Sequence, residues 1–289
     1  MFYKVLGRTG YKVSIVTIGG CGPGFTSTVD EAVKAFEQAL KEGLNMVDIA
    51  PSYGNAETYL GPIIHQYRNR LVIAEKTLER TKEGAGRELK TSLQRLGAKY
   101  FDIYQFHAVN KLEELEEIMG EGGALEAFLE AREQGLIKYI GLTAHADMRL
   151  VVRALEQFDF DTILIPVYAA ALTSPSPEND FRPVLKIAED KDIGVIAIKS
   201  IARRRWKTDY RSYNTWYEPF TEQEDIDRAV WFTLSQIPVA TYSMACDVRL
   251  WPKIIRAAKR LKVLDPNEQE EVVGHFKDKG SEPLFPHKE

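Results

Sequence analysis

Short apolar runs alternate with amphipathic runs along most of the chain. Eight segments are nearly continuously apolar and short enough to be buried strands. They comprise residues 14–19, 45–50, 71–76, 101–107, 137–143, 161–167, 194–200 and 238–243. Buried strands that alternate with helices are typical of a parallel sheet covered by helices, so the pattern indicates an α/β protein.

The amphipathic runs between these segments have helical periodicity. In VDEAVKAFEQALKEG, residues 29–43, the apolar side chains recur every three or four positions. One face of that helix holds Ala32, Val33, Phe36, Ala39 and Leu40. Gly43 and Gly135 follow helical runs, where a left-handed residue would end each helix.

Eight β/α units are the number that closes a (β/α)8 TIM barrel. The 289 residues suit a single barrel domain with its core at about 14–260. An open, doubly wound sheet is the alternative, but its first turn usually reads G-x-G-x-x-G, and GGCGPGF at 19–25 lacks that spacing. The barrel is therefore the preferred fold.

Three further segments lie outside the barrel pattern. FYKVLGRTGYKVS, residues 2–14, predicts an N-terminal β-hairpin. Residues 201–221 form a long polar and aromatic loop, and residues 265–289 form a charged tail that contains proline. Long loops in compact domains are usually functional or disordered.

Composition and charge exclude several classes of protein. The chain is 44% hydrophobic and 28% charged, with a formal net charge of −4, so nothing favours nucleic acid or an anionic membrane as a partner. It has no apolar run near the 18 or so residues of a membrane span and no signal-peptide stretch, which predicts a cytoplasmic protein. Cys21 and Cys246 are too few for a disulfide framework or a four-cysteine metal site, and we expect no metal.

Four titratable side chains stand at or just after the ends of three neighbouring strands. They are Asp48, Tyr53, Lys76 and His107. In a barrel, the carboxyl ends of the strands build the active site. A free tyrosine, with a pKa of about 10, is a reluctant acid, and a nearby ammonium lowers that pKa. A carboxylate would hold the ammonium, and an imidazole could position a substrate oxygen, so this set suits protonation of a carbonyl oxygen during hydride transfer.

These four residues, in the segments VDIAPSYG, VIAEKT and YQFHAV, resemble the catalytic tetrad of the aldo-keto reductases. That resemblance implies an (α/β)8 barrel that binds NADP(H), in preference to NAD(H), and reduces an aldehyde or ketone. It makes Tyr53 the general acid, with Lys76 lowering its pKa, Asp48 orienting Lys76 and His107 positioning the carbonyl. The likeness covers nearly the whole chain.

The chain departs from the family at the groups that hold the nicotinamide. After the fifth strand the family has Ser-Asn, whereas this chain has a Gly-x-Thr-x-His variant with Thr143, Ala144 and His145. Counting back from Tyr168 places Ile165 where the family has Gln. The resemblance then assigns cofactor contacts to Gly20, Thr143, Lys199, Ser243 and Arg249, with Lys199 directed at the pyrophosphate and Arg249 at a 2′-phosphate.

The loops at the same rim supply candidates for the substrate pocket. They are Cys21, Phe25, His145 and Trp216. The basic run RRRWK, residues 203–207, is either a phosphate clamp or a solvated loop. The aromatic cluster at 210–220 either lines the pocket or packs the loop onto the barrel.

The sequence thus predicts a cytoplasmic NADPH-dependent carbonyl reductase that acts on a small molecule, with its substrate and oligomeric state undetermined. Two alternatives remain open. One is a nucleotide-sensing barrel without turnover, and the other is a barrel isomerase or lyase that uses Lys76 and Asp48.

Overall fold

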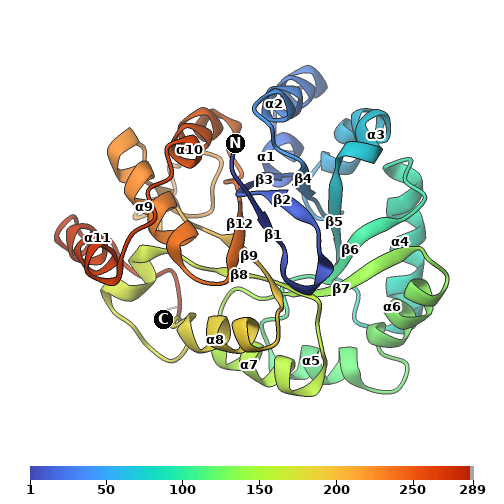
Figure 1. Ribbon diagram of the computed structural model, residues 1–289. Helices are drawn as coiled ribbons and strands as arrows, with labels where there is room; N and C mark the ends of the chain where they lie inside the picture. Colours follow the sequence, from blue (N-terminus) through green and yellow to red (C-terminus); the bar gives the residue numbers. More distant parts are fainter. Residues whose placement is uncertain (287–289) are drawn as a thin grey trace.

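The fold is a closed barrel of eight parallel strands, seen in a computed structural model that describes residues 1–286 (Figure 1). The strand order around the barrel is β12-β3-β4-β5-β6-β7-β8-β9. The strands are β3 (Val16–Gly19), β4 (Met46–Asp48), β5 (Val72–Thr77), β6 (Phe101–Phe106), β7 (Ile137–Thr143), β8 (Thr162–Pro166), β9 (Gly194–Ile198) and β12 (Val239–Ser243). Each predicted strand is present, which confirms the (β/α)8 fold.

Helices surround the barrel and connect consecutive strands. They are α1 (Cys21–Gly24), α2 (Val29–Lys41), α3 (Ala56–Tyr67), α4 (Lys82–Arg95), α5 (Leu112–Met119), α6 (Ala124–Glu133), α7 (Met148–Gln157), α8 (Arg182–Asp190), α9 (Gln223–Ser235) and α10 (Trp251–Lys259). In α2 the Thr28 hydroxyl accepts a hydrogen bond from the Glu31 amide and starts the helix. Gly43 follows the helix with a φ of +91°, the left-handed conformation that the sequence predicted there.

The strands alternate between an inner and an outer core. Inward side chains form a small cluster that includes Met46, Val72, Ala74, Ile103, Leu164, Ile196 and Ala240. Outward side chains pack against the helices in a much larger cluster. Because successive side chains of a strand point to opposite faces, Asp48 lies on the same face as Met46, and Lys76 on the same face as Ala74. Ile165, which stands where the family has Gln, belongs to the outer cluster.

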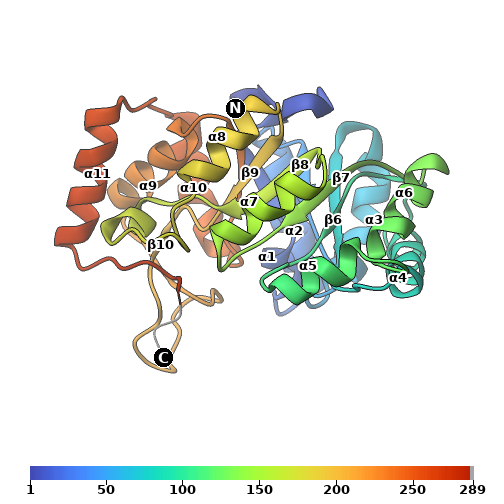
Figure 2. The same ribbon diagram turned by 90° about the horizontal axis from the view of Figure 1, so that it is seen from below.

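The two ends of the barrel are closed differently. The predicted hairpin, β1 (Tyr3–Val5) with β2 (Lys12–Ser14), covers the amino-terminal end, and Leu6 and Val13 join the inner core. The loop that contains β10 (Ala202–Arg204) and β11 (Glu218–Pro219) extends from the opposite end (Figure 2). The carboxyl ends of the strands therefore face this loop.

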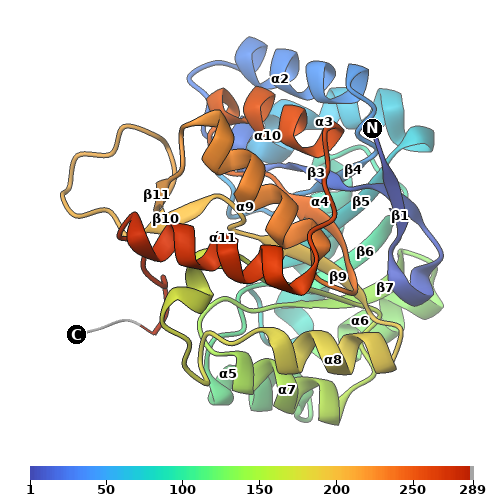
Figure 3. The same cartoon turned by 60° about the vertical axis from the view of Figure 1, so that its left-hand side comes forward.

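The tail is more ordered than its charge suggested. Residues Pro266–Asp278 form helix α11, which begins at a capping box between Asp265 and Glu268. This helix packs along the outside of α9 (Figure 3), and the chain then returns to the loop, where Arg205 donates to the carbonyl of Leu284. Residues 287–289 of the predicted tail lie outside the described part of the chain.

The two cysteines form one disulfide. Cys21 in α1 is bonded to Cys246, which follows β12, with a Cα–Cα separation of 4.9 Å. The bond joins residues 225 positions apart and ties the first and last loops of the barrel together. No described helix is long and apolar enough to cross a membrane.

Candidate active site

The four predicted catalytic residues lie together at the carboxyl ends of the strands. The Lys76 ammonium is 2.6 Å from the Asp48 carboxylate, and both side chains are almost fully buried. The ammonium also lies 4.6 Å from the ring centroid of Tyr53. The His107 ring meets the Tyr53 ring edge-on, with centroids 5.5 Å apart. Strands β4, β5 and β6 are neighbours in the sheet, so inward residues at their ends converge on one point.

Polar neighbours fix the Asp48 carboxylate. The Ser243 hydroxyl donates to Asp48 Oδ2 at 3.1 Å, and Gln105 Nε2 lies 3.4 Å from Asp48 Oδ1. Lys76 makes a further hydrogen bond to the carbonyl of Ile49 at 3.1 Å. With an ion pair and two side-chain donors around it, Asp48 holds the ammonium in one orientation.

Burial and charge act in opposite directions on the two proton-holding groups. Burial raises the pKa of Tyr53 to about 12, although the positive charge of Lys76 acts to lower it. The predicted direction of the Lys76 effect is therefore correct, but burial exceeds it. For Lys76, burial lowers the pKa, and the negative charge of Asp48 and the phenol of Tyr53 more than offset this, so its pKa is raised. Lys76 is an ammonium at neutral pH.

His107 is a neutral imidazole in this environment. Burial lowers its pKa well below the usual range, and the charges of Lys76, Arg80 and Lys199 act in the same direction. The Ser52 hydroxyl lies 3.3 Å from His107 Nδ1. If that hydroxyl donates, the ring proton is on Nε2, where it can be given to a substrate oxygen.

A second pair, of a buried lysine and a half-buried histidine, lies beside the tetrad. Lys199, which follows β9, is 4% exposed, and its Nζ is 2.8 Å from Nδ1 of His145. The rings of His145 and His107 have centroids 6.3 Å apart. Both His145 and Lys199 were candidates from the sequence, and the structure brings them together.

The other predicted cofactor residues occupy three different environments. The Gly20 amide donates to the carbonyl of Asp48 at 2.7 Å, and a Cβ at Gly20 would lie 2.9 Å from that oxygen. The Thr143 hydroxyl accepts from the Ala108 amide at 2.7 Å and keeps its own proton for another acceptor. Ser243 is directed at Asp48, so it acts as a support of the tetrad. Ala144 is buried and has no polar side-chain atom.

A pocket of about 470 Å³ at the first and last loops could hold the phosphate of a nucleotide. Ser27, Lys34, Asn214 and Arg249 contribute polar groups to its lining. Arg249 also pairs with Asp247 at 2.5 Å, which fixes its guanidinium at the edge of this pocket. Two carboxylates also line the pocket, Asp247 paired with Arg249 and Glu31 accepting from the Ser27 amide. The remaining hydroxyl, amide and cationic donors suit an anionic group such as a nucleotide phosphate.

The basic run after β9 is occupied by contacts within the protein. Arg203 and Arg204 both pair with Glu218, at 3.1 and 2.8 Å. Arg205 donates to the carbonyl of Leu284. These contacts brace the loop and the returning tail, so the run is neither a fully solvated segment nor an unengaged phosphate clamp.

The substrate-pocket candidates also separate. Phe25 lines the same pocket as Arg249 and is half exposed. Trp216 lies over Lys199, with the ammonium 4.9 Å from its ring centroid. Cys21 is bonded to Cys246, so it offers no free thiol to a substrate.

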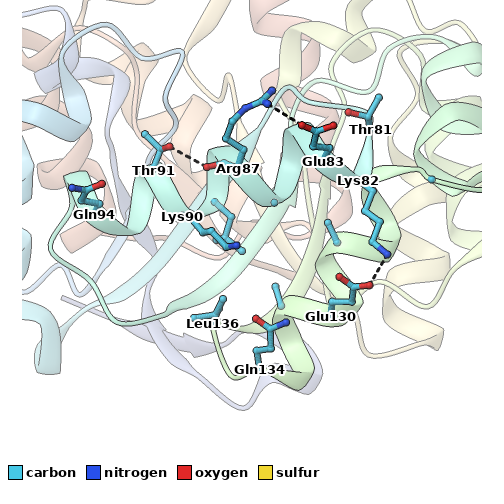
Figure 4. A pocket seen from close by; sticks show the side chains of 15 residues that line it. Thr81, Lys82, Glu83, Arg87, Lys90, Thr91, Gln94, Glu130, Gln134 and Leu136 are labelled. Atoms are coloured by element: carbon cyan, nitrogen blue, oxygen red, sulfur yellow. Dashed lines mark hydrogen bonds and ion pairs between the residues drawn. The ribbon is translucent and has the colours of Figure 1, made fainter.

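A wide groove of the described chain lies away from the tetrad. It has a volume of about 980 Å³ and lies between α4 and α6 on the outside of the barrel. Charged side chains cross it, including Lys82 with Glu130 at 2.6 Å and Arg87 with Glu83 at 3.4 Å (Figure 4). Its walls are helix surfaces, with none of the four tetrad residues.

Sequence reasoning missed three supporting residues. Gln105 and Ser52 contact Asp48 and His107, and Arg80 donates to the carbonyl of His107 at 2.8 Å. Gln105 had a detectable signal, because it precedes His107 by two positions and therefore faces the same side of β6. Ser52 and Arg80 lie in loops, where no strand or helix periodicity predicts which way a side chain points.

Comparisons with known proteins identify the family of this chain. The sequence model described as "Aldo/keto reductase family" matches residues 16–264. Aldo-keto reductase YhdN of Bacillus subtilis is 28% identical over 226 residues, which cover 70% of this chain and 63% of that protein. L-galactose dehydrogenase of Arabidopsis thaliana is 28% identical over 215 residues, which cover 69% of this chain and 65% of that protein.

Solved structures show the same architecture. Aldo-keto reductase AKR11C1 from Bacillus halodurans, in its holo form, superposes with a TM-score of 0.72 at 17% identity, over 100% of this chain and 99% of that one. At that identity the likeness concerns the fold. The family match extends over the barrel strands that carry Asp48, Lys76 and His107, and the chain belongs to the aldo/keto reductase family.

Proposed function

We propose that this protein is an NADPH-preferring reductase of small aldehydes or ketones, with Tyr53 as its general acid. The observation that carries the proposal is the buried ion pair of Lys76 with Asp48, 2.6 Å long, placed against the ring of Tyr53. A cation held there stabilises the phenolate that remains after Tyr53 gives up its proton. When bound, a reduced nicotinamide supplies the hydride.

Each residue has a distinct part in the proposed reaction. His107, neutral through burial, donates a hydrogen bond to the carbonyl oxygen and orients it toward Tyr53. Tyr53 transfers its proton to that oxygen as negative charge develops there. Lys76 stabilises the resulting phenolate, and Asp48 keeps Lys76 in place. Burial raises the pKa of Tyr53 to about 12, so the phenol stays protonated at neutral pH until charge develops on the substrate.

The residues that would hold the cofactor are the ones that fit an anionic dinucleotide. They are Gly20 and Thr143 near the tetrad, with Arg249 and the pocket around it for the phosphate of NADPH. The cations of that pocket, Lys34 and Arg249, support NADPH over NADH.

The lyase alternative requires Lys76 as a nucleophilic amine. An ammonium with a raised pKa in a 2.6 Å ion pair has no lone pair to offer, so the structure favours a reductase. The nucleotide-sensing alternative differs from the reductase only in turnover.

The decisive experiment is a fluorescence titration with NADPH and NADH, followed by Tyr53→Phe assayed on a panel of aldehydes. We expect binding to persist in the variant while kcat falls by about 100-fold or more. Tyr67→Phe, at the end of α3, is the matched control. Nucleotide binding without turnover in the unmodified protein would support the sensing alternative, and unchanged turnover in Tyr53→Phe would remove Tyr53 as the acid.

A further inference from the structure

Buried Lys199 and half-buried His145 form a pair whose outer nitrogen, His145 Nε2, has no hydrogen-bond partner in the described chain. Lys199 is 4% exposed, and no described carboxylate lies within ion-pair distance of its ammonium. Its one hydrogen-bond partner in the described chain is His145 Nδ1, at 2.8 Å. His145 Nε2 is buried and has no partner. Buried polar groups are nearly always paired, so a missing acceptor is implied.

The chain holds this pair in place by several independent contacts. Lys199 has a φ of +66°, a left-handed conformation that is uncommon for a residue with a side chain. The rings of Trp216 and Phe285 lie 4.9 and 5.6 Å from its ammonium. The His145 amide donates to Asn110 Oδ1 at 2.9 Å. A lysine kept in this conformation under aromatic rings is built into the site, in contrast to a mobile surface lysine.

We propose that Lys199 and His145 form an anion subsite that binds the carboxylate of an oxo-acid substrate, next to the position of its carbonyl. The proposal rests on the proposed reductase function. If Lys199 donates to His145 Nδ1, the ring proton is on Nε2, and that N–H and the remaining Lys199 N–H groups are free to bind carboxylate oxygens. The ring of His107, which orients the carbonyl, is 6.3 Å away, so a short oxo acid can reach both.

Charge at this end of the barrel also favours an anion. Lys76, Arg80 and Lys199 all act on His107, whereas Asp48 is already paired with Lys76. Burial lowers the pKa of Lys199 well below its usual range. A bound carboxylate stabilises the ammonium and acts to raise that pKa again.

The cofactor is a second possible source of the anion, because a phosphate oxygen would satisfy the same donors. The two sources predict different consequences for Lys199→Met, which removes the charge and keeps the length of the side chain. Loss of a carboxylate contact affects only acidic substrates. Loss of a phosphate contact weakens NADPH binding and affects all substrates equally.

The experiment compares 4-oxobutanoate with its methyl ester, in the unmodified protein, Lys199→Met and Lys199→Arg, with Lys90→Met on α4 as the control. We expect the unmodified protein to prefer the acid. Lys199→Met should lose about 10- to 100-fold in kcat/KM for the acid and little for the ester, with an unchanged Kd for NADPH. Lys199→Arg should recover part of the preference. Equal losses for acid and ester together with weaker NADPH binding, or no preference for the acid in the unmodified protein, would overturn the proposal.

A binding measurement separates this proposal from the proposed function. Calorimetry of butanoate binding reports occupation of the subsite without turnover. We expect binding in the unmodified protein and at least about 10-fold weaker binding in Lys199→Met. If no carbonyl compound were reduced and Lys199-dependent binding were still seen, the reductase would fail and the subsite would remain. If 4-oxobutanoate were reduced without any Lys199-dependent binding of butanoate, the subsite would fail and the reductase would remain.

Discussion

Removing the charge of Asp48 tests whether the buried ion pair is the central electrostatic feature of this barrel. In Asp48→Asn the amide oxygen can still accept hydrogen bonds from Ser243 and Gln105, but the Lys76 ammonium loses its counter-charge. Lys76 is 0% exposed, so the unpaired charge would have no access to water. Breaking a buried pair by removing one partner costs about 3–5 kcal/mol, and we expect the free energy of unfolding to fall by that amount.

A double-mutant cycle isolates the interaction from the other effects of each substitution. The four proteins are the unmodified chain, Asp48→Asn, Lys76→Met and the double variant, each unfolded in guanidinium chloride. With both charges gone no uncompensated ion remains. The free energy of unfolding that the double variant loses should therefore be smaller, by about 2 kcal/mol or more, than the sum of the losses in the two single variants. Asp180→Asn is the matched surface control, since its partner Arg182 is 59% exposed, and it should cost less than about 1 kcal/mol. If the loss in the double variant equalled the sum of the two single losses within about 0.5 kcal/mol, the reasoning would be refuted.

Two further perturbations follow from the same structure. Burial lowers the pKa values of His107 and His145 well below 6.5, so just below that pH the unfolded chain binds protons that the folded chain does not. Stability should therefore fall as the pH falls, by up to about 1.4 kcal/mol per pH unit for each histidine. Urea unfolding between pH 5 and 7 should show that the free energy of unfolding changes less steeply with pH in His107→Gln and in His145→Gln. His65→Gln is the surface control. An unchanged dependence on pH in both variants would contradict this. Replacing Cys21 and Cys246 together by Ser should lower the free energy of unfolding by about 2–5 kcal/mol, because the bond closes a loop of 225 positions. A reductant should then destabilise the unmodified protein alone, and equal sensitivity of the double variant would show that the effect does not come from this bond.

Sequence periodicity was sufficient for the barrel and for the three members of the tetrad at strand ends. Eight apolar runs separated by amphipathic helices leave few ways to bury every strand on both faces, so the closed sheet follows from local pattern. The two-residue period of a strand then places Asp48, Lys76 and His107 on the inner face, and the parallel direction of the strands brings them to one end. These features depend on residues close together in the chain or on strands that are neighbours in the sheet.

The remaining features depend on contacts between distant segments, which no local pattern encodes. Ser243, which was predicted to hold the cofactor, donates a hydrogen bond to Asp48, 195 positions away. The disulfide, the helix at 266–278 and the return of the tail to Arg205 arise in the same way. Whether burial or the charge of Lys76 decides the pKa of Tyr53 depends on how completely water is excluded, and only tertiary packing determines that. The pairing of Lys199 with His145 likewise exists only because β7 and β9 end at the same mouth of a closed barrel.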